Sequence, residues 1–271
     1  MRSGSWNTFC DLHKHAWFFH REEWIDYQMA YRPENVDESF AVLGTDGSVV
    51  AVAPLVVSKS AEGASEFSFS GAPTPRLLHH PRDGRFDPPG LHAVVEDQRE
   101  RVAKRYGVKR GVFGGWATDD DANADSPITQ RVVLLTHPEP ALWQAVRKSY
   151  KALIHRGEER YGLDAFGGNN DGAVLGFALY QQLHRTLYGD PRPSETYAAQ
   201  GAWLVDGHAL AVTASERVTQ FIPPGVPVTD GAAYWIVYKG SAYYASGAYA
   251  EDNVAHAVVW RSLLALKARG V

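Results

Sequence analysis

The sequence predicts an α/β fold made of two similar halves, each a mixed sheet flanked by helices. Its 271 residues, 45% of them hydrophobic and 12% aromatic, are enough for one large or two ordinary domains with buried cores. An order of two helices followed by a β-hairpin is predicted twice along the chain. We therefore expect two domains, residues 1–137 and residues 138–271.

Amphipathic helices and a hairpin open the first half. Apolar side chains recur at helical spacing in Trp6–His20 and Glu22–Tyr31, which predicts two short helices. The β-rich runs Phe40–Leu43 and Val49–Val57 are joined by a turn that contains Asp-Gly at residues 46–47. Because Asp-Gly favours a tight reversal, these runs are predicted to pair as a hairpin.

Short strands, loops and one long helix complete the first half. The helix is predicted over Leu91–Tyr106, and Gly107 follows it as a residue suited to a left-handed helix end. The proline-rich segment Ala72–Pro89 and the acidic segment Thr118–Ser126 are predicted loops. Three further runs are predicted strands: Glu66–Gly71, Gly111–Trp116 and Arg131–Thr136.

A basic helix opens the second half and is predicted as one piece over Trp143–Leu163. Arg147 and Lys151 fall four residues apart, and Lys148 and Arg156 flank them, so the positive groups share a broad face. Apolar residues at helical spacing form its other side.

The remainder of the second half follows the plan of the first. Leucines at every fourth residue predict a helix over Ala173–Tyr188. A second Asp-Gly turn, at residues 206–207, predicts a hairpin of Trp203–Val205 with His208–Ala214. Two strands and a closing amphipathic helix follow: Ala233–Lys239, Ser241–Ser246 and Asn253–Arg269.

Charge and cysteine content limit the classes of function. The formal net charge is −4, so any polyanion would have to bind a local basic patch. Cys10 is the single cysteine, which excludes an internal disulfide and a cysteine-based metal cluster, and no H-E-x-x-H zinc pattern occurs. We therefore expect no bound metal. We also expect a cytoplasmic protein, because no run is apolar and long enough for a signal peptide or a membrane span.

Three blocks of sequence carry a family resemblance. Residues 147–157 follow the pattern R-x-S-x-x-x-x-I-x-R-G, residues 183–197 read LHRTLYGDPRPSETY, and residues 242–247 read AYYASG before a predicted helix. With these blocks the chain resembles the Fem-type (FemABX) peptidyltransferases, which are tandem GNAT-like acyltransferases. The resemblance implies two GNAT-like halves, similar to acyl-CoA N-acyltransferases in fold, and covers nearly the whole chain.

The resemblance also implies a reaction. Characterised Fem-type enzymes take an aminoacyl group from aminoacyl-tRNA, so we expect an acyltransferase that forms an amide bond on a peptidoglycan precursor or a small metabolite. An aminoacyl ester is already activated, so no covalent enzyme intermediate is needed, which agrees with the absence of a G-x-S-x-G motif. No cofactor is expected beyond this donor.

Two other functions remain open. One is an acyl-CoA-dependent N-acyltransferase, although the turn at residues 246–254 reads SGAYAEDNV rather than the R/Q-x-x-G-x-G/A loop that binds pyrophosphate. The other is a non-catalytic GNAT-like module that binds a ligand or partner.

The basic helix is the candidate tRNA-binding surface. Four cations on it would contact phosphates: Arg147, Lys148, Lys151 and Arg156. The alternative is a solvated helical face, with these side chains paired to Glu158 and Glu159.

A second group of residues matches the family's acceptor cleft. Arg192, held in a Pro-Arg-Pro turn, is suited to binding a carboxylate or phosphate, and Ser194 and Tyr197 follow it. His184 is the candidate general base. The alternatives are a surface turn in which Ser194 caps the next helix, and a buried histidine with satisfied hydrogen bonds.

Two late tyrosines complete the prediction. The resemblance of the AYYASG block to the family implies a catalytic role for Tyr244 and a substrate-binding role for Tyr249. The alternative is that both belong to the core or to the sheet surface.

Overall fold

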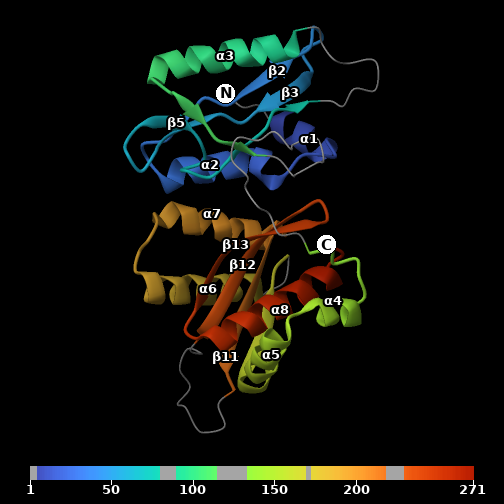
Figure 1. The fold of residues 1–271 in the computed structure, drawn as a ribbon. Coiled ribbons are helices and arrows are strands. Elements are labelled where there is room, and N and C mark those ends of the chain that lie inside the picture. The colour runs from blue at the N-terminus through green and yellow to red at the C-terminus, as the bar shows by residue number, and fades with distance from the viewer. Residues whose placement is uncertain (1–4, 80–89, 115–132, 169–171, 218–228) are drawn as a thin grey trace. The chain divides into compact units, whose positions relative to one another are not determined.

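The computed structural model describes residues 5–79, 90–114, 133–168, 172–217 and 229–271. The chain divides into two compact units, Met1–Gln130 (unit 1) and Arg131–Val271 (unit 2) (Figure 1). Each unit has its own sheets and its own buried apolar clusters.

The described residues of unit 1 form short strands in three small sheets, of order β1-β4-β5-β8, β2-β3-β7 and β6-β9. Its helices are α1 (Ser5–Leu12), the 3-10 helix η1 (Phe18–His20), α2 (Glu22–Tyr31) and α3 (Leu91–Tyr106). Its strands are β1 (Val36–Asp37), β2 (Phe40–Leu43), β3 (Val49–Ala53), β4 (Val56–Lys59), β5 (Ser65–Phe67), β6 (Thr74–Pro75), β7 (Leu78–His79), β8 (Arg110–Gly111) and β9 (Phe113–Gly114).

Helix α3 covers two of these sheets and closes the core of unit 1 (Figure 1). Its Leu91 and Val95 pack against Ala51 of β3, and Val102 packs in a separate cluster against residues of β4 and β5. The helix ends at Gly107, whose φ of 66° is left-handed, as predicted.

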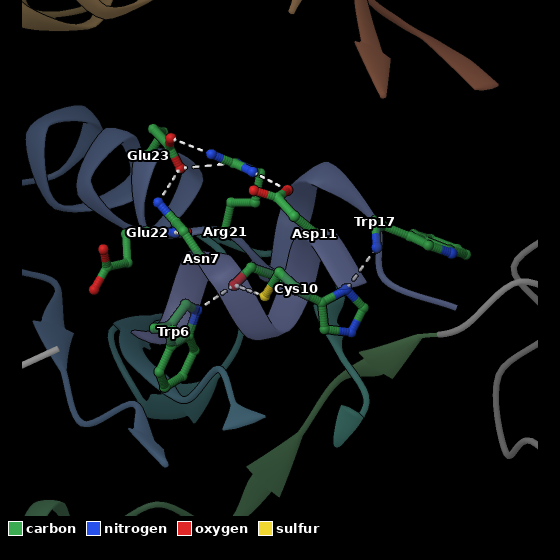
Figure 2. A network of polar contacts seen from close by, with 9 residues as sticks. Trp6, Asn7, Cys10, Asp11, Trp17, Arg21, Glu22 and Glu23 are labelled. Atoms are coloured by element: carbon green, nitrogen blue, oxygen red, sulfur yellow. Dashed lines mark hydrogen bonds and ion pairs between the residues drawn. The ribbon is translucent and has the colours of Figure 1, made fainter. Parts of the chain in front are cut away.

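Polar contacts join α1 to η1 and α2 on the side of unit 1 away from α3 (Figure 2). The buried Arg21 guanidinium pairs with Asp11 and, at 2.7 Å, with Glu23. Asn7 accepts a hydrogen bond from the Glu22 backbone N–H at 3.1 Å and donates one to Glu23. Burial acts to raise the pKa of Glu23, but the hydrogen bonds and charge of Arg21 lower it, so this carboxylate stays ionised.

Unit 2 contains one four-stranded antiparallel sheet of order β10-β11-β12-β13. Its helices are α4 (Glu139–Ala145), α5 (Lys148–Arg160), α6 (Gly172–Tyr188), α7 (Ser194–Val205) and α8 (Asp252–Ala268). Its strands are β10 (Tyr161–Phe166), β11 (Ala209–Glu216), β12 (Thr229–Tyr238) and β13 (Ser241–Tyr249).

The two faces of this sheet carry different helices. Tyr234 contacts the rings of Phe177 and Tyr180 on α6, and its hydroxyl donates to the Gln200 carbonyl of α7 at 2.7 Å. The next residue, Trp235, belongs to the core cluster that includes Val258 of α8. Because side chains alternate along a strand, one face packs on α6 and α7 (the α6 face) and the other on α8 (the α8 face).

The predicted single helix over Trp143–Leu163 is wrong. The chain leaves the helix at Val146 and Arg147, whose ψ angles of 132° and 141° are extended, and α5 then begins at Lys148. The last residues of the predicted helix form the start of β10, paired with β11.

Other predicted elements are confirmed, divided or corrected. Helices α2, α3, α6 and α8 and the β12–β13 strands lie where they were expected. The predicted helix Trp6–His20 divides into α1 and η1, the predicted strand Val49–Val57 divides at Pro54, and β8 and β9 divide the predicted strand Gly111–Trp116.

Two predicted strands are wrong over the described residues. Trp203–Val205 belongs to the end of α7, so a helix, not a strand, precedes the Asp-Gly turn and β11. Residues 133–136 of the predicted strand Arg131–Thr136 are irregular or turn. The predicted loop Ala72–Pro89 is wrong in its first part, which contains β6 and β7. Residues 80–89 of that loop and the predicted loop Thr118–Ser126 lie outside the described residues.

Candidate functional site

Arg192 stands at the centre of a polar cluster on the α6 face. The Pro-Arg-Pro segment precedes α7, and its Arg192 guanidinium stacks over the Tyr197 ring at 4.4 Å. One nitrogen, Nη2, donates to the Tyr180 hydroxyl at 2.7 Å. The guanidinium is thus held by a π-face and a hydroxyl, which together fix its plane.

Tyr180 connects this arginine to the edge strand β13. It is fully buried, and its hydroxyl lies 2.5 Å from the Ser246 Oγ. Burial raises the pKa of the Tyr180 phenol, although the charge of Arg192 opposes that shift. The phenol therefore stays protonated at neutral pH and can serve as a hydrogen-bond donor.

Ser246 borders a β-bulge in the sheet. Tyr234 pairs with Ser246, and Trp235 pairs with Tyr244, so Ala245 is an extra residue in β13. A bulge takes a residue out of the regular ladder and redirects the neighbouring side chains, and bulges are common beside active sites.

His184 lies one turn after Tyr180 on α6 and contacts Tyr197. Its Nδ1 lies 3.0 Å from the Tyr197 hydroxyl, and both side chains are buried. Burial and the charge of Arg192 lower the pKa of His184 to about 4. The imidazole is therefore neutral at pH 7, with Nδ1 hydrogen-bonded to the Tyr197 hydroxyl, and is a weak base there.

Ser194 does not join this cluster. It is the first residue of α7 and is exposed, and its Oγ donates to the Glu195 carboxylate at 3.2 Å. The cap position of the helix is Pro193. Neither the predicted capping role nor a contact with Arg192 is seen for Ser194.

Tyr244 and Tyr249 form a separate pair on the α8 face. Their hydroxyls lie 3.1 Å apart, and Tyr244 packs edge-on against Trp235 at 5.1 Å. A Cβ on Gly247 would meet the Tyr244 hydroxyl at 2.2 Å and the Tyr249 hydroxyl at 2.5 Å, so only glycine allows both rings to close here. Burial raises the pKa of both phenols, which therefore donate hydrogen bonds and do not act as bases at neutral pH.

The predicted acceptor residues thus occur as two groups on opposite faces of β13, joined through the bulge. His184, Arg192 and Tyr197 form one group, and Tyr244 and Tyr249 form the other. Sequence reasoning missed two members of the first group: Tyr180 and Ser246. The four-residue spacing of Tyr180 and His184 on one helix was a signal for the former, but no sequence pattern links Ser246 to α6.

The basic residues of α5 lie at the start and along the exposed side of that helix. Arg147 and Lys148 are exposed in its first turn, where the helix dipole is also positive and no acidic residue occurs. Lys151 lies over the Trp143 ring at 5.5 Å, and Arg156 donates to the Ala152 carbonyl at 3.2 Å.

None of these four cations forms an ion pair with a carboxylate in the part of the chain that the structure describes. Glu158 instead pairs with His155 at 3.8 Å. The exposed Tyr150 ring lies beside them and contacts His256 of α8 at 4.7 Å. The surface therefore carries uncompensated positive charge together with an exposed aromatic ring.

The turn between β13 and α8 carries the opposite charge. Glu251 is the residue that precedes the first turn of α8, and its carboxylate pairs with Arg160 at 2.9 Å. The Glu251 side chain makes no hydrogen bond to the first-turn N–H groups of α8, so its charge is met by Arg160 and not by the helix.

The described ranges contain neither a cluster of metal-ligating side chains nor a helix suited to a membrane. No group of three or more His, Cys, Asp or Glu side chains there is arranged to hold a metal ion. No helix within those ranges has both the length and the apolar character needed to cross a membrane.

Comparisons with known proteins identify the fold. No protein-family model matches the chain, and no curated protein sequence matches it. The crystal structure of FemX matches 100% of this chain and 86% of its own, with a TM-score of 0.60 and 11% identity. A GCN5-related glucosamine N-acetyltransferase region of a fungal multi-domain GH3 β-N-acetylglucosaminidase covers 93% of this chain and 31% of its own, but its TM-score is only 0.38 at 10% identity.

The chain therefore has the fold of FemX along its whole length, which confirms the α/β class and the tandem GNAT-like architecture predicted from the sequence.

Proposed function

We propose that this protein is an acyltransferase that forms an amide bond, moving an aminoacyl group from aminoacyl-tRNA to an amine acceptor. The acceptor would be a peptidoglycan precursor or a small metabolite. The observation that carries the proposal is the oriented Arg192 guanidinium beside the bulged strand, within a FemX-like fold.

Arg192 would bind an anionic group of the acceptor. A guanidinium presents several N–H donors in one plane and is suited to a carboxylate or phosphate. Its stacking on Tyr197 and its bond to Tyr180 fix that plane before the ligand arrives, so less side-chain entropy is lost on binding. His184 would act as a positioning residue, because its hydrogen bond with the Tyr197 hydroxyl holds that ring under Arg192.

The chemistry requires little from the protein beyond positioning and charge stabilisation. The acceptor nitrogen attacks the ester carbonyl carbon, a C–N bond forms, and the C–O bond to the ribose breaks. The proton lost by the amine ends on the released ribose oxygen. Ala245, displaced from the ladder by the bulge, would offer its backbone N–H to the oxyanion. The Ser246 and Tyr180 hydroxyls share one proton in their mutual hydrogen bond, so this pair would supply one further hydroxyl donor.

The charge of unit 2 favours tRNA over acyl-CoA as the donor. Among the described residues the α5 cations pair with no carboxylate, and a phosphate-binding surface needs such unpaired cations. The turn into α8 carries Glu251 and Asp252 and lacks the arginine and the paired glycines of a pyrophosphate-binding loop, which disfavours acyl-CoA.

Donor binding tests the choice. Purified protein is mixed with aminoacylated tRNA, and in parallel with acetyl-CoA, at two salt concentrations. We expect tRNA affinity that falls as salt rises, and no CoA binding. CoA binding without tRNA binding would replace the proposal by a CoA-dependent N-acyltransferase. Binding of neither donor would favour a non-catalytic module.

A further inference from the structure

Unit 1 contains a polar hollow that the proposed transfer does not use. Its volume is about 330 Å³, within the range of small-molecule sites. It lies where the β4–β5 turn, β5 and β8 meet the end of α2, entirely within unit 1. Five charged side chains line it: Arg32, Lys59, Glu62, Glu66 and Arg110.

Glu66 is the deeply buried charged residue of this lining, with 6% of its surface exposed. Its Oε1 accepts a hydrogen bond from the Ser68 hydroxyl at 2.7 Å. Ser68 in turn accepts the Gly71 backbone N–H at 2.8 Å, and its Oγ lies 2.6 Å from Ser58. The single hydroxyl proton of Ser68 is used in its hydrogen bond to Glu66. Ser58 must therefore be the donor in the Ser58–Ser68 hydrogen bond, so both hydroxyls donate in the direction of the carboxylate.

The carboxylate has no positive partner in the described part of the chain. Arg110 is the neighbour of Glu66 across the parallel β5–β8 pairing, but the two side chains form no ion pair. Lys59 instead donates to Ser65 at 2.9 Å, and Arg32 lies 3.5 Å from Glu34. A buried carboxylate without a cation is costly, and a cationic group of a ligand would offset that cost.

We propose that this hollow binds a compact zwitterion, with its primary ammonium on Glu66 and its carboxylate or phosphate on Arg110 and Lys59. The buried Glu66 is fixed by its hydroxyl chain, whereas the cations are exposed around it, so the hollow offers both charges at different depths. The backbone at Ser70, which also lines the hollow, is held in place by a hydrogen bond to its side chain. Ser70 has a left-handed φ of 53°, and its hydroxyl accepts from the Asn35 amide at 3.0 Å.

Calorimetric titration of the full chain tests this site. The probes are the common free L-amino acids, which carry a carboxylate, and O-phosphoethanolamine, which carries a phosphate. Ethylamine carries only the ammonium group and inorganic phosphate only the anionic group, so each can engage one half of the proposed site. We expect at least one zwitterion to bind about tenfold or more tighter than either half. Ethylamine or phosphate binding as tightly as every zwitterion, or no binding at all, would overturn the proposal.

Matched variants locate the binding. Glu66→Gln and Arg110→Gln should each abolish zwitterion binding, whereas Glu62→Gln, a lining residue with exposed surface, should preserve it. Arg110 is exposed, so its variant is expected to fold even if Glu66→Gln does not. Unchanged affinity in Arg110→Gln would contradict the site. Because the readout is binding to unit 1, failure here leaves the proposed transfer untouched.

Discussion

At the scale of single residues, the neutral state of His184 follows from its position. Burial and the charge of the nearby Arg192 both disfavour the imidazolium. Its ordinary pKa is 6.5, and in the folded protein its pKa is about 4. At a pH between these two pKa values, His184 binds a proton in the unfolded chain but not in the folded chain.

This difference predicts a stability loss in acid. As pH falls from 6.5 to 4, proton uptake by the unfolded state should lower the free energy of unfolding by up to about 3 kcal/mol. The loss begins just above pH 6.5, where the unfolded-state imidazole starts to take up its proton, and fades at higher pH. His184→Asn keeps an acceptor near the Nδ1 position but does not titrate, so its melting temperature should fall less over that window. Parallel melting curves for the two proteins across the window would contradict the assignment.

Gly247 makes a second residue-scale prediction. Gly247→Ala places a Cβ against the hydroxyls of Tyr244 and Tyr249 and should cost about 1–3 kcal/mol of stability. Tyr244→Phe removes the nearer of these hydroxyls, so the double variant should recover part of the loss. Denaturant unfolding of the two single variants and the double variant measures this coupling. If the stability losses of the two single variants simply added in the double variant, the Tyr244 hydroxyl would not be in contact with residue 247.

The sequence revealed part of this cluster and not the rest. His184, Arg192 and Tyr197 belong to one continuous block, so a local pattern could identify them. Tyr180 and Ser246 are brought together by the packing of α6 on the sheet, which no local pattern encodes.

At the scale of elements, predictions failed where tertiary contacts override a local pattern. The break at Val146 carries neither proline nor glycine, and the structure instead packs Trp143 on Trp260 at 5.0 Å before the chain turns into α5. The short run Trp203–Val205 is apolar, and such a run fits a strand or a helix end equally well. Helices with long periodic patterns, such as Ala173–Tyr188, were predicted correctly.

The basic side of α5 gives an element-scale prediction. Lys148→Glu with Lys151→Glu should weaken tRNA binding and reduce its log–log salt slope by about 1.5 to 2. Stability should change by less than about 1 kcal/mol, because a glutamate in the first turn favours the helix dipole. The control is Lys104→Glu with Lys109→Glu in unit 1, which changes net charge equally. If both double variants bound tRNA with equal affinity, the basic residues of α5 would not be part of the tRNA-binding surface.

At the scale of the whole molecule, unit 2 contains both candidate surfaces and a core of its own. Its apolar cluster joins residues of α4, α5, α8 and the four strands, and includes Ile154, Tyr161 and Val258. The cations of α5 and the Arg192 cluster therefore depend on one folding unit.

This organisation predicts that residues 131–271 fold without unit 1. The isolated fragment should unfold cooperatively and retain mixed helix and strand content by circular dichroism. A fragment without a cooperative transition would show that the core of unit 2 depends on unit 1.

The central claim is that the protein transfers an aminoacyl group to an amine, and label transfer tests it most directly. Aminoacyl-tRNA labelled on the amino acid is incubated with the protein and a panel of amines that includes a peptidoglycan precursor, and alkali-stable amide is measured. We predict protein-dependent transfer to an acceptor bearing an anionic group, reduced at least about tenfold by Arg192→Ala and little changed by Lys104→Glu. No transfer to any acceptor, or transfer that Arg192→Ala leaves unchanged, would contradict the account.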